Sequence, residues 1–94
     1  MISTTITKEY FEKKMKDMDN EGHFWEFKDT SEHWKRLHRI EIPTEIVFLV
    51  GNKPYRFMCV FIAQWAKWQV PDEYQDAVKT PMVWALQCVP LEDS

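Results

Sequence analysis

The fold is decided by residues 46–63, IVFLVGNKPYRFMCVFIA, where two apolar runs flank the turn residues at 51–54. Gly, Asn and Pro between runs of β-branched and aromatic residues are typical of a β-hairpin. Apolar residues occupy both faces of the second run, as in a strand that is covered on both sides. A helix is the open alternative there, because four apolar residues recur at helical spacing. They are Met58, Phe61, Ile62 and Trp65. We favour a strand to about Ile62.

An amphipathic helix is predicted over residues 7–19. The Thr7 side chain can cap its first turn, where Glu9 also favours the positive end of the helix dipole. Apolar side chains then recur at helical spacing opposite the lysines, which are expected to face water. The lysines are Lys13, Lys14 and Lys16. Residues 20–22, Asn-Glu-Gly, suit the left-handed conformation that often follows a helix.

A short strand or extended arm and a second helix are predicted next. Residues 23–28, HFWEFK, are rich in strand-favouring side chains. Asp29 and Glu32 have the spacing of a capping box, which predicts a helix starting there. Trp34 supplies part of its apolar stripe, and Pro43 ends it because the residue before a proline is pushed out of the α region.

The C-terminal part of the chain predicts one more helix and one more strand. Pro71 at a first helical position predicts a short helix over 70–80, and residues 82–89, MVWALQCV, predict a third buried strand. Helices grouped around an antiparallel hairpin are typical of the α+β class. We therefore expect one α+β domain over residues 1–94, a small antiparallel sheet of three or four strands with two to three helices packed mainly on one face.

Composition narrows the classes of protein that fit. The 94 residues are 45% hydrophobic with five Trp, which is enough for one core. The net charge of −3 does not favour a duplex-DNA binder, which usually carries a basic stripe. The N-terminal residues MISTT lack the pattern of a secretory signal, and no apolar run approaches the roughly 20 residues that span a bilayer. We expect a cytoplasmic protein that does not enter membranes.

Neither a catalytic centre nor a metal site is predicted. Cys59 and Cys88 lie inside apolar runs, where cysteine behaves as a small hydrophobe, although their distance from each other is left open. His33 and His38 are five residues apart, about 140° around a helix, so they do not share a face. The acids at 72–73 suit the start of a helix. We expect no enzymatic activity, no cofactor and no metal.

The chain has more Trp residues than a core of this size can bury, so one or two are expected at the surface. Trp and Arg are enriched at the energetic centres of protein interfaces. Trp65 and Trp68 lie where the chain turns polar, which predicts a surface for binding another protein. Trp34 with Arg36 and Arg39 combines a ring and cations, which predicts the alternative, stacking on nucleic-acid bases. These five residues are the predicted binding residues.

Short stretches of the chain resemble the phage inhibitor of uracil-DNA glycosylase, a small α+β protein. They are residues 42–45, 51–54 and 84–86. The match covers under a fifth of the chain, and that family is strongly acidic and has a charged helix where this chain has residues 46–50. No functional residue is carried over.

The function predicted from these observations is that of a small non-enzymatic protein-binding module. It would act as an inhibitor or adaptor on a larger partner, and a phage-encoded protein in the host cytoplasm is one origin that fits this role. A homodimer is an open alternative, because a sheet with helices on one face needs a cover on the other. Nucleic-acid or nucleotide binding through the aromatic and basic patch is the rival function.

Overall fold

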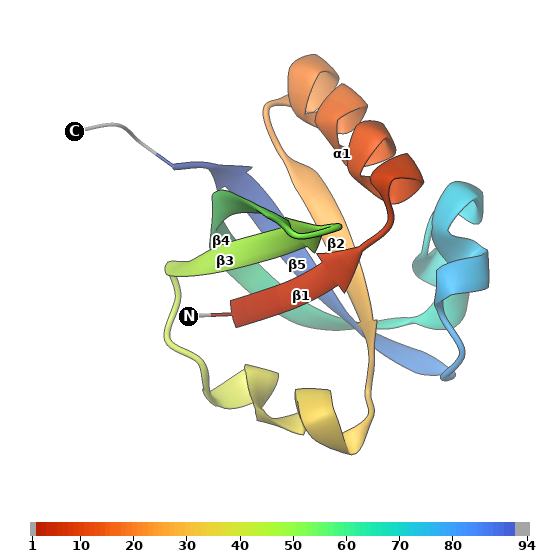
Figure 1. Cartoon of the computed structure of the whole chain (residues 1–94). Coiled ribbons are helices and arrows are strands. Elements are labelled where there is room, and N and C mark those ends of the chain that lie inside the picture. The colour runs from red at the N-terminus through yellow and green to blue at the C-terminus, as the bar shows by residue number, and fades with distance from the viewer. Residues whose placement is uncertain (1, 92–94) are drawn as a thin grey trace.

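The computed structural model describes residues 2–91, except for the side chains of Glu32 and His33. In this range five strands form one sheet in the order β1-β3-β4-β5-β2. They are β1 (Ile2–Ile6), β2 (Phe24–Asp29), β3 (Thr44–Val50), β4 (Lys53–Ala66) and β5 (Met82–Pro90). β1 runs parallel to β3, and every other pair is antiparallel. The sheet curls into an open half-barrel, with β1 and β2 as its two free edges (Figure 1).

The predicted sheet of three or four antiparallel strands with two to three helices on one face is therefore wrong. The strand that the sequence did not predict is β1, which pairs with β3 from Ile2 opposite Ile46 to Ile6 opposite Val50. Its middle residues are Ser and Thr, of which Thr4 is buried. Polar side chains hide the alternation by which half-buried strands are recognised, and only the neighbouring strand makes this segment extended.

The predicted N-terminal helix is confirmed, although Lys14, which was expected to face water, is buried. α1 (Lys8–Glu21) begins after Thr7, whose Oγ1 accepts a hydrogen bond from the backbone N–H of Tyr10 at 3.2 Å. Gly22 follows it with φ of 79°, and its N–H donates to the carbonyl of Met18. A side chain with a Cβ would be strained in this conformation. α1 is the one α-helix among the described residues.

The other two predicted helices are 3₁₀ turns. They are η1 (Glu32–Arg39) and η3 (Asp72–Ala77), and a third turn, η2 (Lys67–Gln69), follows β4. The predicted capping box is wrong, because Asp29 ends β2 and its carboxylate accepts hydrogen bonds from the backbone of Lys79 and Thr80. This long-range partner removes the cap on which a regular helix would have started.

The hairpin of β3 and β4 is confirmed, with Gly51 in its turn at φ of 64°. β4 continues as strand to Ala66, so the helical alternative for this region is wrong. A bulge lies between Cys59, which pairs with Cys88, and Phe61, which pairs with Gln87. Because a bulge inserts one extra residue, Cys59 and Phe61 point to opposite faces. The mixed apolar pattern that resembled a helix comes from this change of face.

The two faces of the sheet carry separate clusters of buried side chains. The inner cluster comprises Ile2, Phe24, Leu37, Ile46, Phe48, Cys59, Trp84, Leu86 and Cys88. The outer cluster comprises Phe27, Val70, Tyr74, Val78, Val83 and Ala85. η3 covers the outer face only at this second cluster, so the rest of the outer face has no helix over it within residues 2–91 (Figure 1).

Candidate functional site

Three aromatic rings lie together on the outer face of the sheet. Trp25 of β2 and Phe61 of β4 both pair with Gln87 of β5, from its two sides. The ring centroids of Trp25 lie 6.2 Å from Phe61 and 4.7 Å from Trp65. We call Trp25, Phe61 and Trp65 the aromatic surface. The rings meet across β5 because the outer position between Phe27 and Ala63 is Ala85, which leaves room above the strand.

The aromatic surface is partly open to solvent. Phe61 is 45% exposed, and Trp25 and Trp65 are half-buried. Beyond Phe61 along the outer face, a shallow apolar groove of about 350 Å³ continues between β4 and the end of β5. It is lined by Pro43, Met58, Val60, Val89, Pro90 and Leu91. The uncovered part of the sheet is therefore apolar, with aromatic rings at one side of the groove.

A charged pair sits on the same face at the β3 side. Arg56 donates two hydrogen bonds to the Glu45 carboxylate, from Nε to Oε1 and from Nη2 to Oε2, each at 2.8 Å. The guanidinium holds the pKa of Glu45 below its ordinary value, and the carboxylate raises the pKa of Arg56. Bidentate pairing leaves a polar edge of fixed geometry beside the apolar surface.

The predicted binding residues Trp65 and Trp68 both reach the surface, from consecutive elements. Trp65 belongs to the aromatic surface, whereas Trp68 lies in η2 and is 81% exposed. The η2 turn is fixed at its start, where the backbone N–H of Ala66 donates to the Gln69 side chain at 2.8 Å. An indole held this far out of the fold buries little area of its own and is available for contact with another molecule.

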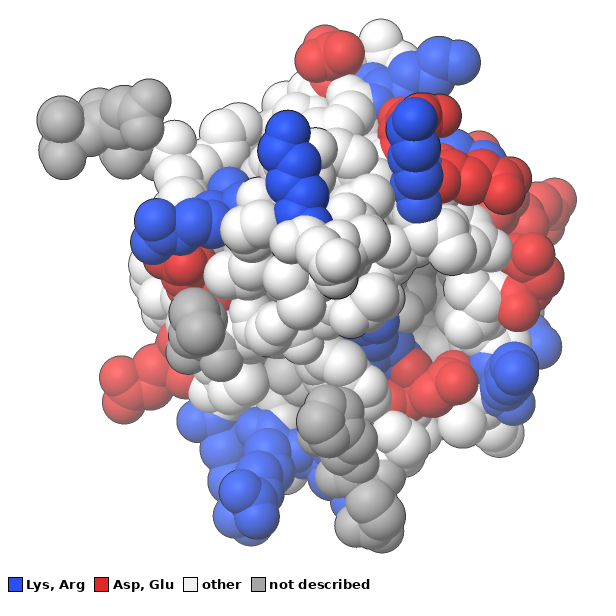
Figure 2. Space-filling view, in the orientation of Figure 1, with Lys and Arg blue, Asp and Glu red and all other residues white. Residues whose placement is uncertain are grey.

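The other three predicted binding residues lie in η1, on a different side of the molecule (Figure 1). Trp34 is half-buried and packs against the inner cluster, with the Lys28 Nζ 5.1 Å from its ring centroid. Arg36 and Arg39 are exposed, and Figure 2 shows basic side chains gathered over this turn. The ring and the cations therefore point to different environments, and the five predicted residues do not form one site.

Sequence reasoning missed the two residues that complete the aromatic surface, Trp25 and Phe61. Alternation within 23–28 places Trp25 opposite to Phe24, so this residue carried a usable signal. Phe61 carried none, because its side of the sheet is set by the bulge that precedes it. The pairing of both with Gln87 follows from the register of three strands, which only the folded chain defines.

The cysteines lie in the core, as their apolar surroundings predicted. Cys59 and Cys88 are directly opposite each other on β4 and β5, fully buried, with free thiols. Burial raises the pKa of both thiols, so the reactive thiolate is disfavoured. Within the described residues, no group of three or more His, Cys, Asp or Glu side chains is placed to hold a metal ion.

Comparisons with protein-family models, curated proteins and solved structures find no match to this chain. Among residues 2–91, no helix combines the length and apolar character that crossing a membrane requires.

Proposed function

We propose that this chain is a non-enzymatic protein-binding module that docks on a partner protein through the aromatic surface. The observation that carries the proposal is the contact of Trp25, Phe61 and Trp65 on an uncovered sheet face. Aromatic residues and Arg are enriched in protein interfaces, where such rings supply most of the binding free energy. The groove beside Phe61 and the Glu45–Arg56 pair provide the apolar and polar contacts that surround such a centre.

The partner we propose is a different protein, to which this module binds reversibly as an inhibitor or adaptor. Obligate homodimers bury large, mainly hydrophobic interfaces that resemble a core cut in half. Here the large hydrophobic side chains that are exposed among the described residues are scattered over four positions. They are Ile42, Phe61, Trp68 and Met82. The rings of the aromatic surface instead lie against one another, which favours a non-obligate interface.

Affinity capture followed by direct titration tests this proposal. The purified chain is used as bait in a lysate, and the captured protein is identified, purified and titrated against wild type, Phe61→Ala and Trp65→Ala. Each substitution is expected to weaken binding by more than about 1 kcal/mol, because truncated hot-spot rings leave an unfilled contact. Unfolding curves must show that both variants remain folded.

Met82→Ala is the matched control, because Met82 is 41% exposed, close to the 45% of Phe61, but lies outside the aromatic surface. It should bind the partner as wild type does. Equal binding by all three variants would refute the aromatic surface as the docking site. Light scattering at rising protein concentration tests the alternative that the aromatic surface binds a second copy of this chain. A dimer that is lost in Phe61→Ala would support self-association in place of binding to a different protein.

Nucleic-acid binding is the second candidate function, and the observation that favours it is the exposure of Arg36 and Arg39 on η1. Phosphate contacts by such cations give binding that weakens steeply with salt. The base-stacking role of Trp34 is less well supported, because its indole packs against the inner cluster. Titration of single-stranded oligonucleotides at low salt, with Arg36→Ala and Arg39→Ala, tests this function, and the absence of binding would exclude it.

A further inference from the structure

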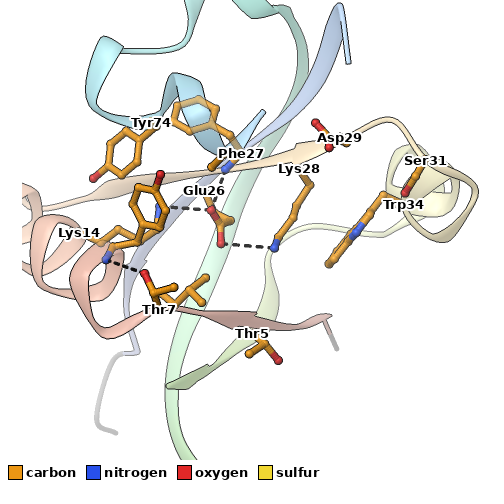
Figure 3. A pocket seen from close by; sticks show the side chains of 13 residues that line it. Thr5, Thr7, Lys14, Glu26, Phe27, Lys28, Asp29, Ser31, Trp34 and Tyr74 are labelled. Atoms are coloured by element: carbon orange, nitrogen blue, oxygen red, sulfur yellow. Dashed lines mark hydrogen bonds and ion pairs between the residues drawn. The ribbon is translucent and has the colours of Figure 1, made fainter. Parts of the chain in front are cut away.

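A cavity of about 380 Å³ opens where the end of β1 approaches the middle of β2, between α1 and η3. Figure 2 shows the hollow to the right of centre, with basic and acidic groups at its lower rim. Its walls come from five elements, and four of the side chains are aromatic (Figure 3). The rings are Tyr10, Phe27, Trp34 and Tyr74. The volume lies within the range of sites for small organic ligands, and the lining combines these rings with polar and charged side chains.

Glu26 is the buried polar group of this cavity. Its side chain is 8% exposed, and Oε1 accepts a hydrogen bond from the backbone N–H of Phe27 at 2.9 Å. Oε2 is buried and accepts no hydrogen bond from any residue in the described range. The Lys28 Nζ lies 3.8 Å from Oε2, which is longer than a hydrogen bond. An acceptor buried without a donor costs about 1–3 kcal/mol of folding free energy, so its retention calls for an explanation.

Lys14 does not supply the missing donor, because its own contacts are already made. Its ammonium donates to the carbonyl oxygen of Trp25 at 2.6 Å and lies 3.2 Å from Glu26 Oε1. It also lies 4.6 Å from the ring centroid of Tyr74. Lys14 therefore ties α1 to β2 and to η3. Lys28 differs, since its ammonium lies 5.1 Å from the centroid of the Trp34 ring and its ion pair with Glu26 is long, at 3.8 Å.

Glu26 and Lys28 thus present an acceptor beside a donor, next to aromatic rings (Figure 3). The charges of the cavity balance, with Lys14 and Lys28 against Glu26 and Asp29. A charged ligand would be repelled by a like charge among these four side chains. Removing its own charge from water would also cost free energy. An uncharged ligand with an N–H next to a C=O would form a hydrogen bond with Glu26 Oε2 and another with the Lys28 ammonium.

We propose that this cavity binds an uncharged planar aromatic molecule that carries a primary carboxamide or an equivalent donor–acceptor edge. The N–H of the ligand donates to Glu26 Oε2, and its carbonyl oxygen accepts from the Lys28 Nζ. The ligand edge enters between the two groups and opens their 3.8 Å ion pair. The aromatic walls take up the ring.

Benzamide is the probe that tests this site on the whole chain, observed by amide chemical-shift changes of the labelled protein. We expect a dissociation constant of about 1 mM or tighter, which suits a ligand of this size. The shifts should be confined to residues 26–31, the Trp34 indole N–H and the facing residues of α1. N,N-dimethylbenzamide keeps the ring and the acceptor but has no donor, and benzoate carries a charge. Both are expected to bind at least about tenfold more weakly.

Lys28→Met removes the donor and keeps the aliphatic stem, and it should weaken benzamide binding about tenfold or more. Lys53→Met is the matched control, because the Lys53 Nζ also lies over a ring, 5.3 Å from the centroid of Tyr55, away from the cavity. It should leave binding unchanged. If Lys28→Met does not fold, the benzamide and dimethylbenzamide comparison on wild type decides alone. Absent or dispersed shifts, or equal binding of the two amides, would overturn the proposal, as would tighter binding of benzoate.

Discussion

The inner and the outer face of the sheet are formed by the same strands but differ in how far their aromatic and aliphatic side chains are buried. On the inner face Ile46, Phe48 and Leu86 are fully buried. On the outer face Phe61 is 45% exposed, and Trp25 and Trp65 are half-buried against each other. Side chains of similar hydrophobicity therefore contribute differently, since only area removed from water stabilises the fold. The inner face and the buried outer cluster stabilise the fold, whereas the aromatic surface retains apolar area that can be buried against a partner.

Phe48→Ala should give the largest loss of stability and is the strongest test of this comparison. Phe48 is fully buried between Phe24 and Phe57, at ring distances of 5.4 and 5.8 Å. Its truncation leaves a cavity and should lower the free energy of unfolding by about 3–5 kcal/mol. Urea denaturation measures it, and Phe48→Leu provides a milder variant if the first does not fold. A loss below about 1 kcal/mol would contradict the assignment of the inner face as the core.

Lys14→Met should cost about 3 kcal/mol, because it leaves the Glu26 carboxylate buried without its closest cation. Lys14 was predicted on the solvated side of its helix, and this is wrong, since its side chain is 2% exposed. Urea denaturation of Lys14→Met, Glu26→Leu and the double variant gives the coupling between the two. The double variant should recover most of the loss, because an apolar pair needs no charge partner. Additive losses would show that the pair is not coupled.

Alkaline pH should reveal the contact between α1 and η3. The Tyr10 hydroxyl donates to the Asp76 carboxylate, and this hydrogen bond raises the pKa of Tyr10 from 10.0 to about 12. A folded-state pKa above the unfolded value means that the contribution is complete below about pH 10 and is lost as pH rises towards 12. Burial raises the pKa of Tyr74 in the same direction.

Tyr10→Phe is therefore expected to reduce, but not abolish, the fall in unfolding free energy between about pH 10 and about pH 12. Tyrosine ionisation is followed by ultraviolet absorbance against pH in both proteins, and the transition that is missing in the variant is that of Tyr10. An identical pH slope in the two proteins would mean that the Tyr10 contact does not form.

Trp68→Ala should have the smallest effect on stability, within about 0.5 kcal/mol. Its side chain is 81% exposed, so little apolar area returns to water when it is truncated. Urea denaturation beside Phe48→Ala makes the comparison direct. A loss above about 1 kcal/mol would show that Trp68 packs on the fold and would remove it from the candidate binding residues.

Local sequence patterns predicted the elements whose signals are local. The Thr7 cap and Gly22 bounded α1, and the residues at 51–54 set the hairpin turn. The apolar run at 82–89 gave β5. The exposure of Trp68 also follows from a surplus of Trp for which a small core has no room. In each case the signal needs only neighbouring residues, because caps, turns and alternation are short-range properties of the chain.

The sequence by itself determined these elements and an aromatic surplus, and the tertiary structure decided how they are used. β1 is a strand because β3 offers an unpaired edge, and the bulge after Cys59 turns Phe61 outward. Trp25 and Phe61 meet because β5 lies between their strands, and Lys14 is buried because Glu26 and the Trp25 carbonyl receive it. These outcomes depend on residues far apart in the chain, whose free energies of contact exist only once strand register is fixed.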